Sequence, residues 1–400
     1  MPAPDDRPDV LASLDALLAD DPQLRDRLVR SLALADERAR AGLDPRVRDA
    51  LPWPTDLASY RSYLQDFLRW VPQESADPAW REPDPAHRSA REVSTRLAHL
   101  FWLVDQHGED EPRAVEESAE FAAWLTDYAR EWGAFLDTPE SFGPDVLQSF
   151  LDDAPDYTVE ESMVDGFPNA PSGWTTFNQF FARELNPGLR PISAPDDVRV
   201  VTSPADCSFV HHYDIGADHR IPATTIKRTH TYGSIPELLS GSPHAEAFAG
   251  GTFTHYMLPP SSYHRFHLPV AGRVLEAPVV QGHAYMQVDL VDGQLQSVDA
   301  ADSGYEFHQT RGWVVLDTAV GDGPDLGLVA VVAVGMAHVA SVRITAVPGT
   351  TSPKGQQFGF FQFGGSDVVV LLQAGVADQV DTDPGPRKVG SVIATAHTRG

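Results

Sequence analysis

Residues 1–150 carry apolar positions at the three- and four-residue spacing that is typical of amphipathic helices. The clearest runs are 9–40, 56–71 and 120–136, where leucine and aromatic residues alternate with Asp and Arg. Prolines at positions 52, 54, 72 and 78 separate these runs. The pattern predicts a helical N-terminal half.

The helical half is rich in tryptophan. We interpret these side chains as core or packing residues, and an aromatic substrate-binding box is the alternative. They are Trp70, Trp80, Trp102, Trp124 and Trp132.

The hydrophobic period changes after about residue 165. The segment FNQFFARELNPGLRPI, residues 177–192, predicts a short amphipathic helix that ends at Asn-Pro-Gly. From residue 200 onward, short apolar and β-branched runs are joined by Gly, Pro and Asp turns, and 389–396 could add a last strand. We therefore expect an α+β protein, with a helical domain over 1–165 and a mostly antiparallel β domain over 166–400.

Charge and cysteine content narrow the classes of function. The chain has 57 Asp and Glu against 30 Lys and Arg, a formal net charge of −27, which disfavours nucleic acid and anionic membrane surfaces as partners. Its one cysteine, Cys207, excludes an intrachain disulfide and a CxxC metal site.

The sequence shows no clear targeting or membrane segment. The N-terminal residues lack an apolar signal core, and the apolar run 326–340 is typical of buried sheet. We therefore expect a soluble cytoplasmic protein without a stable membrane anchor.

Two short segments carry candidate acid–base residues. In SSYHRFHLP, His264 and His267 fit a hydrogen-bonded loop pair, a metal site or general acid–base work. The metal interpretation lacks the further ligands and the HExxH motif that zinc sites use. In SPADCSF, Asp206 fits a turn residue that bonds its own backbone, or a carboxylate that orients a histidine.

The stretch FGGSDVVVLL, residues 363–372, places two glycines and Ser366 directly before a buried-looking strand. This arrangement fits a tight turn, and it equally fits a peptide bond that undergoes nucleophilic attack. GxSxG, Walker and GxGxxG motifs are absent from the sequence. Asp206, His267 and Ser366 have the side-chain types of a nucleophilic triad, in which a carboxylate, a base and a nucleophile act together. Their order in the sequence alone does not distinguish such a triad from an ordinary turn.

Five segments occur in an order that resembles the phosphatidylserine decarboxylase family of pyruvoyl-dependent decarboxylases. The resemblance covers roughly residues 173–375. The segments are TFNQFFARELNPGLRPI, VVTSPAD, YHRFHLPVAGRV, VGMAHVASV and KGQQFGFFQFGGSDVVVLL.

The resemblance implies a self-processing enzyme. The Ser366 hydroxyl would attack the carbonyl of Gly365, and β-elimination would then cleave the chain between them and leave a pyruvoyl group derived from Ser366. Asp206 and His267 resemble the residues that activate Ser366, and His264 resembles the histidine that protonates the product carbanion. The pyruvoyl carbonyl would form a Schiff base with the substrate amine, so no external cofactor is expected.

Three features depart from the common family pattern. Cys207 follows Asp206 where glycine is usual, Asp367 follows Ser366 where Thr or Ser is frequent, and a long acidic helical half precedes the β half. These features resemble the soluble branch that includes L-tryptophan decarboxylases. We expect a free L-amino acid as substrate, with aromatic amino acids as candidates, and the resemblance suggests a homodimer. Phosphatidylserine as substrate, and an unprocessed relative that acts as a binding protein, stay as alternatives.

Overall fold

The computed structural model describes residues 9–81, 91–108, 113–171, 173–226, 230–284, 286–297, 307, 309–321, 323–335, 342–364 and 366–399. The chain divides into two compact units. The first consists of Met1–Asp156 and His283–Asp299, and the second of Tyr157–Gly282 and Ala300–Gly400.

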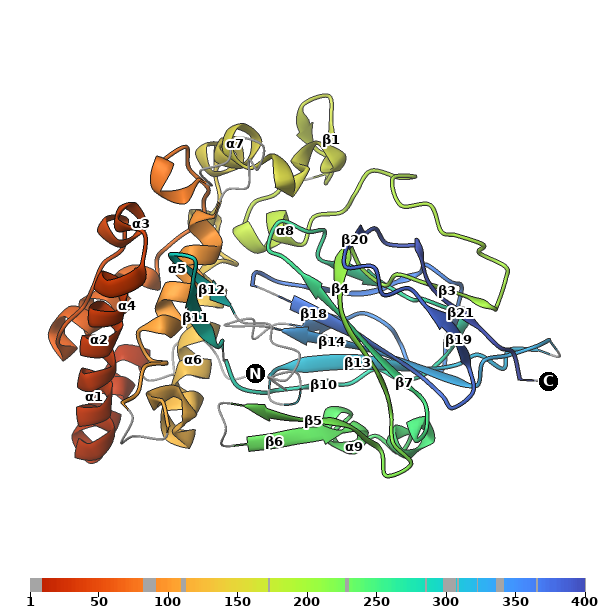
Figure 1. The fold of residues 1–400 in the computed structure, drawn as a ribbon. Coiled ribbons are helices and arrows are strands. Elements are labelled where there is room, and N and C mark those ends of the chain that lie inside the picture. The colour runs from red at the N-terminus through yellow and green to blue at the C-terminus, as the bar shows by residue number, and fades with distance from the viewer. Residues whose placement is uncertain are drawn as a thin grey trace. The chain divides into compact units, whose positions relative to one another are not determined.

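The first unit is built mainly from helices, as the apolar spacing predicts (Figure 1). Its helices are α1 Val10–Asp20, α2 Pro22–Gly42, α3 Pro45–Ala50, α4 Leu57–Phe67, α5 Glu92–Trp102, α6 Ala119–Phe135 and α7 Pro144–Asp153. The tryptophans pack within it: Trp124 donates its indole N–H to the Val10 carbonyl at 2.8 Å, and Trp132 donates to the Trp70 carbonyl at 2.9 Å.

Aspartates fix where the first helices begin. Asp9, Asp21, Asp44 and Asp56 are the N-cap residues of α1 to α4, and each accepts a hydrogen bond from a backbone N–H of the first turn. Such a cap satisfies a donor that the helix itself leaves free. Asp21 also divides the periodic run 9–40 into two helices, with Pro22 in the first turn of the second.

A β-hairpin from late in the sequence belongs to the first unit. Its strands, β11 Val288–Val291 and β12 Gln294–Ser297, are antiparallel and lie beside α5 (Figure 1). Asp105 accepts from the Val288 N–H at 3.2 Å, and the Asp44 N–H donates to the Gly293 carbonyl at 2.8 Å. From the sequence we predicted a strand here and assigned it to the β domain over 166–400. Its contacts with Asp44 and Asp105 leave no local signal, because these residues are distant in sequence.

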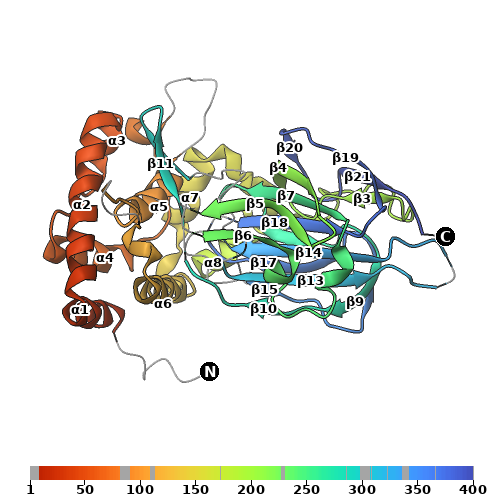
Figure 2. The same cartoon turned by 60° about the horizontal axis from the view of Figure 1, so that its bottom comes forward.

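The second unit centres on an antiparallel sheet that has nine strands among the described residues. Its order is β16-β9-β13-β14-β18-β7-β4-β20, and β10 also pairs with β13 (Figures 1 and 2). The bounds are β16 Thr351–Ser352, β9 Gly272–Glu276, β13 Arg311–Asp317, β14 Leu328–Gly335, β18 Ser366–Leu372, β7 Thr252–Leu258, β4 Cys207–Asp214, β20 Pro386–Arg387 and β10 Val279–Val280.

Smaller antiparallel sheets complete this unit, and the predicted last strand is present as β21. One sheet holds β15 Val342–Ile344, β17 Gln357–Phe361 and β8 Arg265–His267. Another holds β19 Ala377–Val380, β21 Val392–Ala396 and β3 Val200–Thr202. The two pairs are β5 Arg220–Ile226 with β6 His230–Ser234, and β1 Met163–Val164 with β2 Phe167–Pro168. Together with the helical unit they confirm the α+β class.

Strand β18 lies in the interior of the large sheet. It pairs along one edge with β14 and along the other with β7, and every one of its residues is buried. An unbroken apolar run such as VVVLL, residues 368–372, is typical of a strand covered on both faces. Val369 and Leu371 pack on one face in a core that also contains Ile235 and Leu238 of α9 (Ile235–Leu238).

The helix predicted within 177–192, with its end at Asn186-Pro187-Gly188, is shorter than expected. α8 spans Phe177–Phe181 and ends where Ala182 leaves helical geometry. Pro187 disfavours helical backbone at the residue before it, so the following segment runs through turns toward β3. Among the described residues, no helix combines the length and the apolar character needed to cross a bilayer.

The helical unit offers a direct stability test at two adjacent positions of α2. Leu28 is fully buried, whereas Val29 is 36% exposed. We expect Leu28→Ala to lower the free energy of unfolding by about 2–5 kcal/mol, because a large side chain is removed from a packed site. Val29→Ala is expected to change it by less than about 0.5 kcal/mol. Urea unfolding followed by tryptophan fluorescence measures both, and equal effects would contradict the observed packing.

Candidate active site

Ser366 is the first residue of β18 and is fully buried. It lies in register between Gly335 of β14 and Leu258 of β7. Two residues earlier, Gly364 has φ of 144°, a backbone conformation that residues with a Cβ rarely adopt. The predicted cleavage partner, Gly365, lies outside the described residues. The glycine-serine segment therefore enters the sheet through backbone that requires glycine at position 364.

The side chain of His264 contacts the hydroxyl of Ser366. His264 Nδ1 lies 3.1 Å from Ser366 Oγ, and His264 Nε2 lies 3.1 Å from the carbonyl oxygen of Pro260. A carbonyl only accepts hydrogen bonds, so Nε2 carries the proton and Nδ1 is left with its lone pair. In this tautomer the Ser366 hydroxyl donates to His264 Nδ1, which is the arrangement of a general base and the group that it deprotonates.

Aromatic rings surround this contact and keep it dry. The Phe181 ring of α8 stacks on the His264 ring with centroids 3.9 Å apart and an interplanar angle of 21°. Phe363 packs edge-on against Phe181, and its backbone N–H donates to Asn178 Oδ1 at 3.0 Å. Burial lowers the pKa of His264 to about 3, so the ring is uncharged at neutral pH.

His267 has different partners. Its Nδ1 lies 2.9 Å from the Gly355 carbonyl oxygen and its Nε2 lies 3.1 Å from the Tyr263 hydroxyl. The carbonyl again fixes the tautomer, so Nδ1–H donates to Gly355 and Tyr263 donates to Nε2. Burial lowers the pKa of His267 from its ordinary value. Among the described residues, its hydrogen bonds do not reach Ser366.

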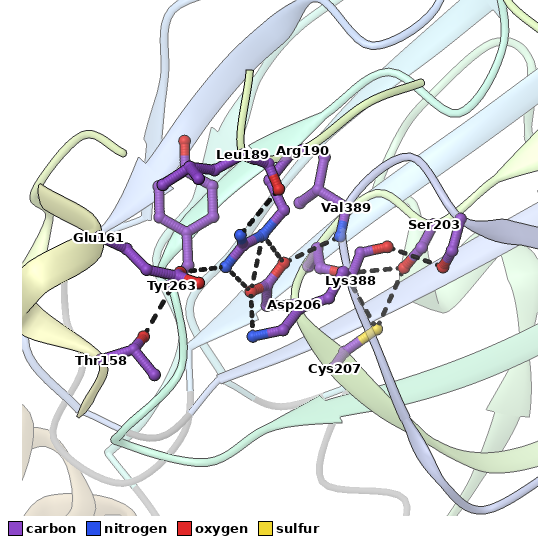
Figure 3. Close-up of polar contacts among 12 residues, drawn as sticks. Thr158, Glu161, Leu189, Arg190, Ser203, Asp206, Cys207, Tyr263, Lys388 and Val389 are labelled. Atoms are coloured by element: carbon purple, nitrogen blue, oxygen red, sulfur yellow. Dashed lines mark hydrogen bonds and ion pairs between the residues drawn. The ribbon is translucent and has the colours of Figure 1, made fainter. Parts of the chain in front are cut away.

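Asp206 is buried and is the centre of a charge cluster, which Figure 3 shows. Its carboxylate accepts from Arg190 Nη2 at 2.6 Å, from Lys388 Nζ at 3.1 Å and from the Val389 N–H at 2.8 Å. Arg190 also donates to Glu161 at 2.7 Å. The cluster thus ties the C-terminal segment that follows β20 to the turn before β4. The predicted role of Asp206 in activating Ser366 stays a prediction.

Sequence reasoning did not identify several side chains that support these groups. Phe181, Asn178 and Arg190 all lie within the motif that begins at Thr176, so the motif itself was a usable signal. Lys388 carries no local signal, because its pairing with Asp206 exists only in the folded chain. Among the described residues, no group of three or more His, Cys, Asp and Glu side chains is arranged to hold a metal ion.

Asp367 points away from Ser366, because successive side chains of a strand alternate between faces. On the opposite face, Asp367 Oδ1 lies 3.4 Å from His255 Nε2 of β7, and both side chains are fully buried. The His211 ring of β4 packs edge-on against His255 with centroids 5.1 Å apart. The departure from the family pattern at position 367 is therefore accommodated by a histidine partner on the next strand.

A family model described as phosphatidylserine decarboxylase matches residues 177–394. That span covers more than half of the chain and contains Asp206, His264, His267 and Ser366. The chain belongs to this family, so it is a carboxy-lyase. The resemblance stated from the sequence motifs is thereby confirmed.

Individual relatives differ in how much of them the chain covers. It is 30% identical over 290 residues to "Decarboxylase iboD" of Amanita muscaria, covering 66% of this chain and 81% of that protein. It is 33% identical over 206 residues to phosphatidylserine decarboxylase proenzyme 3 of Schizosaccharomyces pombe, and 34% identical over 201 residues to the proenzyme of Chlamydia trachomatis. These two matches cover 51% and 50% of this chain, and 19% and 60% of those proteins.

The chain's one cysteine adjoins Asp206 and gives a test of the site's packing. Cys207 Sγ lies 3.4 Å from both Ser203 Oγ and the Ala205 carbonyl oxygen, and burial raises the pKa of the thiol to about 12. We expect no alkylation by iodoacetamide in the folded protein at mildly alkaline pH, since the thiolate is the reactive form. Full labelling is expected in urea, and mass spectrometry distinguishes the two. Rapid labelling of the folded chain would contradict the packing around Asp206.

Proposed function

We propose that this protein is a self-processing pyruvoyl-dependent decarboxylase that acts on a free L-amino acid, with aromatic amino acids such as L-tryptophan as candidate substrates. One observation carries the proposal: the buried hydroxyl of Ser366 donates to the lone pair of His264 Nδ1 at the start of an interior strand. Such a contact supports deprotonation of this serine, and family membership supports decarboxylation as the overall reaction.

In the proposed processing step, Ser366 Oγ attacks the carbonyl carbon of Gly365 and its proton goes to His264 Nδ1. The peptide C–N bond breaks, the nitrogen takes up a proton, and an ester joins the two residues. Loss of the Ser366 α-proton eliminates the Gly365 carboxylate. Water then hydrolyses the resulting enamine through its imine, which releases ammonia and leaves a pyruvoyl group at residue 366.

Two histidines are proposed to have separate tasks. The hydrogen-bond partners support His264 as the base toward Ser366, and they support His267 as a positioning residue that holds Tyr263 and the segment near Gly355. This differs from the sequence-based hypothesis, in which His267 was the processing base. Asp206 is proposed to position the same region through its charge cluster with Arg190 and Lys388.

A pyruvoyl group at residue 366 would supply an electron-withdrawing carbonyl that condenses with the substrate amine and accepts electron density as CO₂ leaves. His264 faces residue 366 and is proposed to hold and return a proton there. Phe181 and Phe363 exclude water from this contact. Because β18 pairs along both edges with β14 and β7, cleavage before Ser366 would leave segment 366–400 seated in the sheet.

The net charge of −27 supports a free amino acid over a phospholipid, because an acidic protein is repelled by anionic membrane surfaces. Phosphatidylserine is the second candidate, since the family model and the S. pombe and C. trachomatis relatives carry that substrate in their names. A cytoplasmic location and a homodimer are further parts of the proposal.

Substitutions at the three polar side chains test the processing step. Ser366→Ala should leave a single folded, inactive chain, because the attacking oxygen is gone. His264→Ala should slow cleavage by about 100-fold or more, the usual contribution of a general base, whereas His267→Ala should slow it less. A time course of intact mass on freshly synthesised protein gives these rates. Cleavage of Ser366→Ala, or a slower His267→Ala than His264→Ala, would contradict this division of roles.

A substrate panel tests the choice of substrate. Processed enzyme is incubated with single L-amino acids and, separately, with phosphatidylserine in detergent micelles, while released CO₂ and the amine product are measured. We expect turnover of one or more aromatic amino acids and none of the lipid. The Ser366→Ala protein serves as the control for background decarboxylation. Turnover of phosphatidylserine alone would overturn the proposed substrate class and leave the decarboxylase chemistry intact.

A further inference from the structure

The helical unit contains a cavity of about 560 Å³ that the proposed reaction does not use. This volume lies in the range of small-molecule sites, roughly 300–1,000 Å³. Every lining residue comes from the segment between α3 and the loop after α4, or from α5. The lining residues are Leu51, Pro52, Trp53, Pro54, Ser59, Ser62, Tyr63, Asp66, Phe67, Trp70, Arg96 and His99.

Aromatic rings form the walls of this cavity and hold one another in place. Trp53 and Tyr63 each meet the ring of His99 edge-on, with centroids 4.8 Å and 5.5 Å apart. Phe67 packs against Trp70 at 5.1 Å. Trp53 is fixed by its indole N–H, which donates to the Arg48 carbonyl at 2.8 Å. Some tryptophans of the helical unit therefore do not belong to its closed core, since Trp53 and Trp70 are only half-buried and line a cavity.

Two charged residues line this cavity, and in the described part of the chain Asp66 is the one without an ion-pair partner. Arg96 is engaged, since its Nε donates to Glu92 at 2.8 Å and its guanidinium lies over the Trp80 ring at 5.0 Å. His99 is neutral at physiological pH, because burial lowers its pKa to about 3. Asp66 is exposed, and within the described part of the chain its carboxylate has neither a hydrogen bond nor an ion pair.

Two further arginines near Asp66 in the sequence have other partners. Arg61 and Arg69 line the neighbouring hollow that Asp66 also borders. Arg61 donates to Asp15 at 3.0 Å, and the Arg69 guanidinium lies over the Phe135 ring at 5.3 Å. The Asp66 carboxylate is thus left to attract a cation from solution at the rim of an aromatic box.

We propose that this cavity binds a small aromatic amine in its ammonium form, with the ring against Trp53, Tyr63 and Trp70 and the ammonium group beside Asp66. Aromatic faces attract cations, and a carboxylate adds a charge-assisted hydrogen bond. The amine product of the proposed decarboxylation belongs to this class of compound, so its identification as the ligand rests on the proposed function. The existence of a binding site is argued independently, from the aromatic cavity and the Asp66 carboxylate, which is unpaired among the described residues.

The same features discriminate against the amino acid substrate. A free amino acid carries a carboxylate next to its ammonium group, and that carboxylate would lie near Asp66 with Arg96 already paired to Glu92. Like charges at close range disfavour binding. The cavity therefore selects for the decarboxylated compound over the amino acid.

The test measures binding of tryptamine and of L-tryptophan to the full chain carrying Ser366→Ala, by isothermal titration calorimetry. This background is expected to be uncleaved, so pyruvoyl chemistry does not contribute heat. Saturable tryptamine binding is expected, with L-tryptophan at least about tenfold weaker. Adding Asp66→Asn should weaken tryptamine binding by about tenfold or more, since it removes the charge. Asp20→Asn, an exposed carboxylate on α1 that does not line the cavity, is the matched control and should leave the dissociation constant unchanged.

The outcomes separate this site from the proposed reaction. Absence of saturable tryptamine binding, equal affinity for L-tryptophan, or an Asp66→Asn variant that binds as tightly as its parent would overturn the cavity proposal, whatever the wild-type enzyme decarboxylates. Tryptamine binding that depends on Asp66 would support it even if the wild-type chain proved unprocessed. Thermal unfolding of each variant checks that lost binding does not reflect lost folding.

Discussion

The hydrogen bond between Ser366 and His264 is the contact on which the functional account depends. It brings together side chains that are 102 residues apart in the sequence, and it does so in a buried environment. Two features outside the pair set its polarity. The Pro260 carbonyl accepts a hydrogen bond from His264 Nε2–H, and the stacked Phe181 ring contributes to the burial that keeps His264 neutral. A charged imidazole at this point could not accept the serine proton, so burial is part of the chemistry.

The surrounding fold keeps this contact in place through backbone pairing. β18 holds Ser366 between β14 and β7, and its apolar side chains fill the cores on both faces. Asp206 secures the chain that follows β20 through Lys388 Nζ and the Val389 N–H, and it also pairs with Arg190. Removing Arg190 or Lys388 would leave the buried Asp206 carboxylate with fewer partners, which is destabilising. These contacts hold Asp206 in place, and its predicted role in activating Ser366 stays a prediction.

Local patterns in the sequence predicted the elements well and the contacts less well. The spacing of Leu24, Leu28 and Leu32 predicts a helix with one buried face, and DVVVLL predicts a strand buried on both faces. By contrast, His264 and His267 are three residues apart at the edge of a strand, and the sequence does not reveal which one faces Ser366. The sequence also does not show that the hairpin at 288–297 packs in the helical unit, because its partners Asp105 and Asp44 are remote in sequence. The helical pattern predicted that the tryptophans pack in a core. It did not distinguish fully buried tryptophans from Trp53 and Trp70, which line a cavity.

The central claim is that the backbone before Ser366 cleaves itself, and an intact mass spectrum of the purified wild-type protein tests it most directly. We predict two masses, one for residues 1–365 and one for residues 366–400, the latter lighter by one ammonia than the same peptide with an N-terminal serine. A single mass corresponding to the full 43.6 kDa chain in active protein would contradict it.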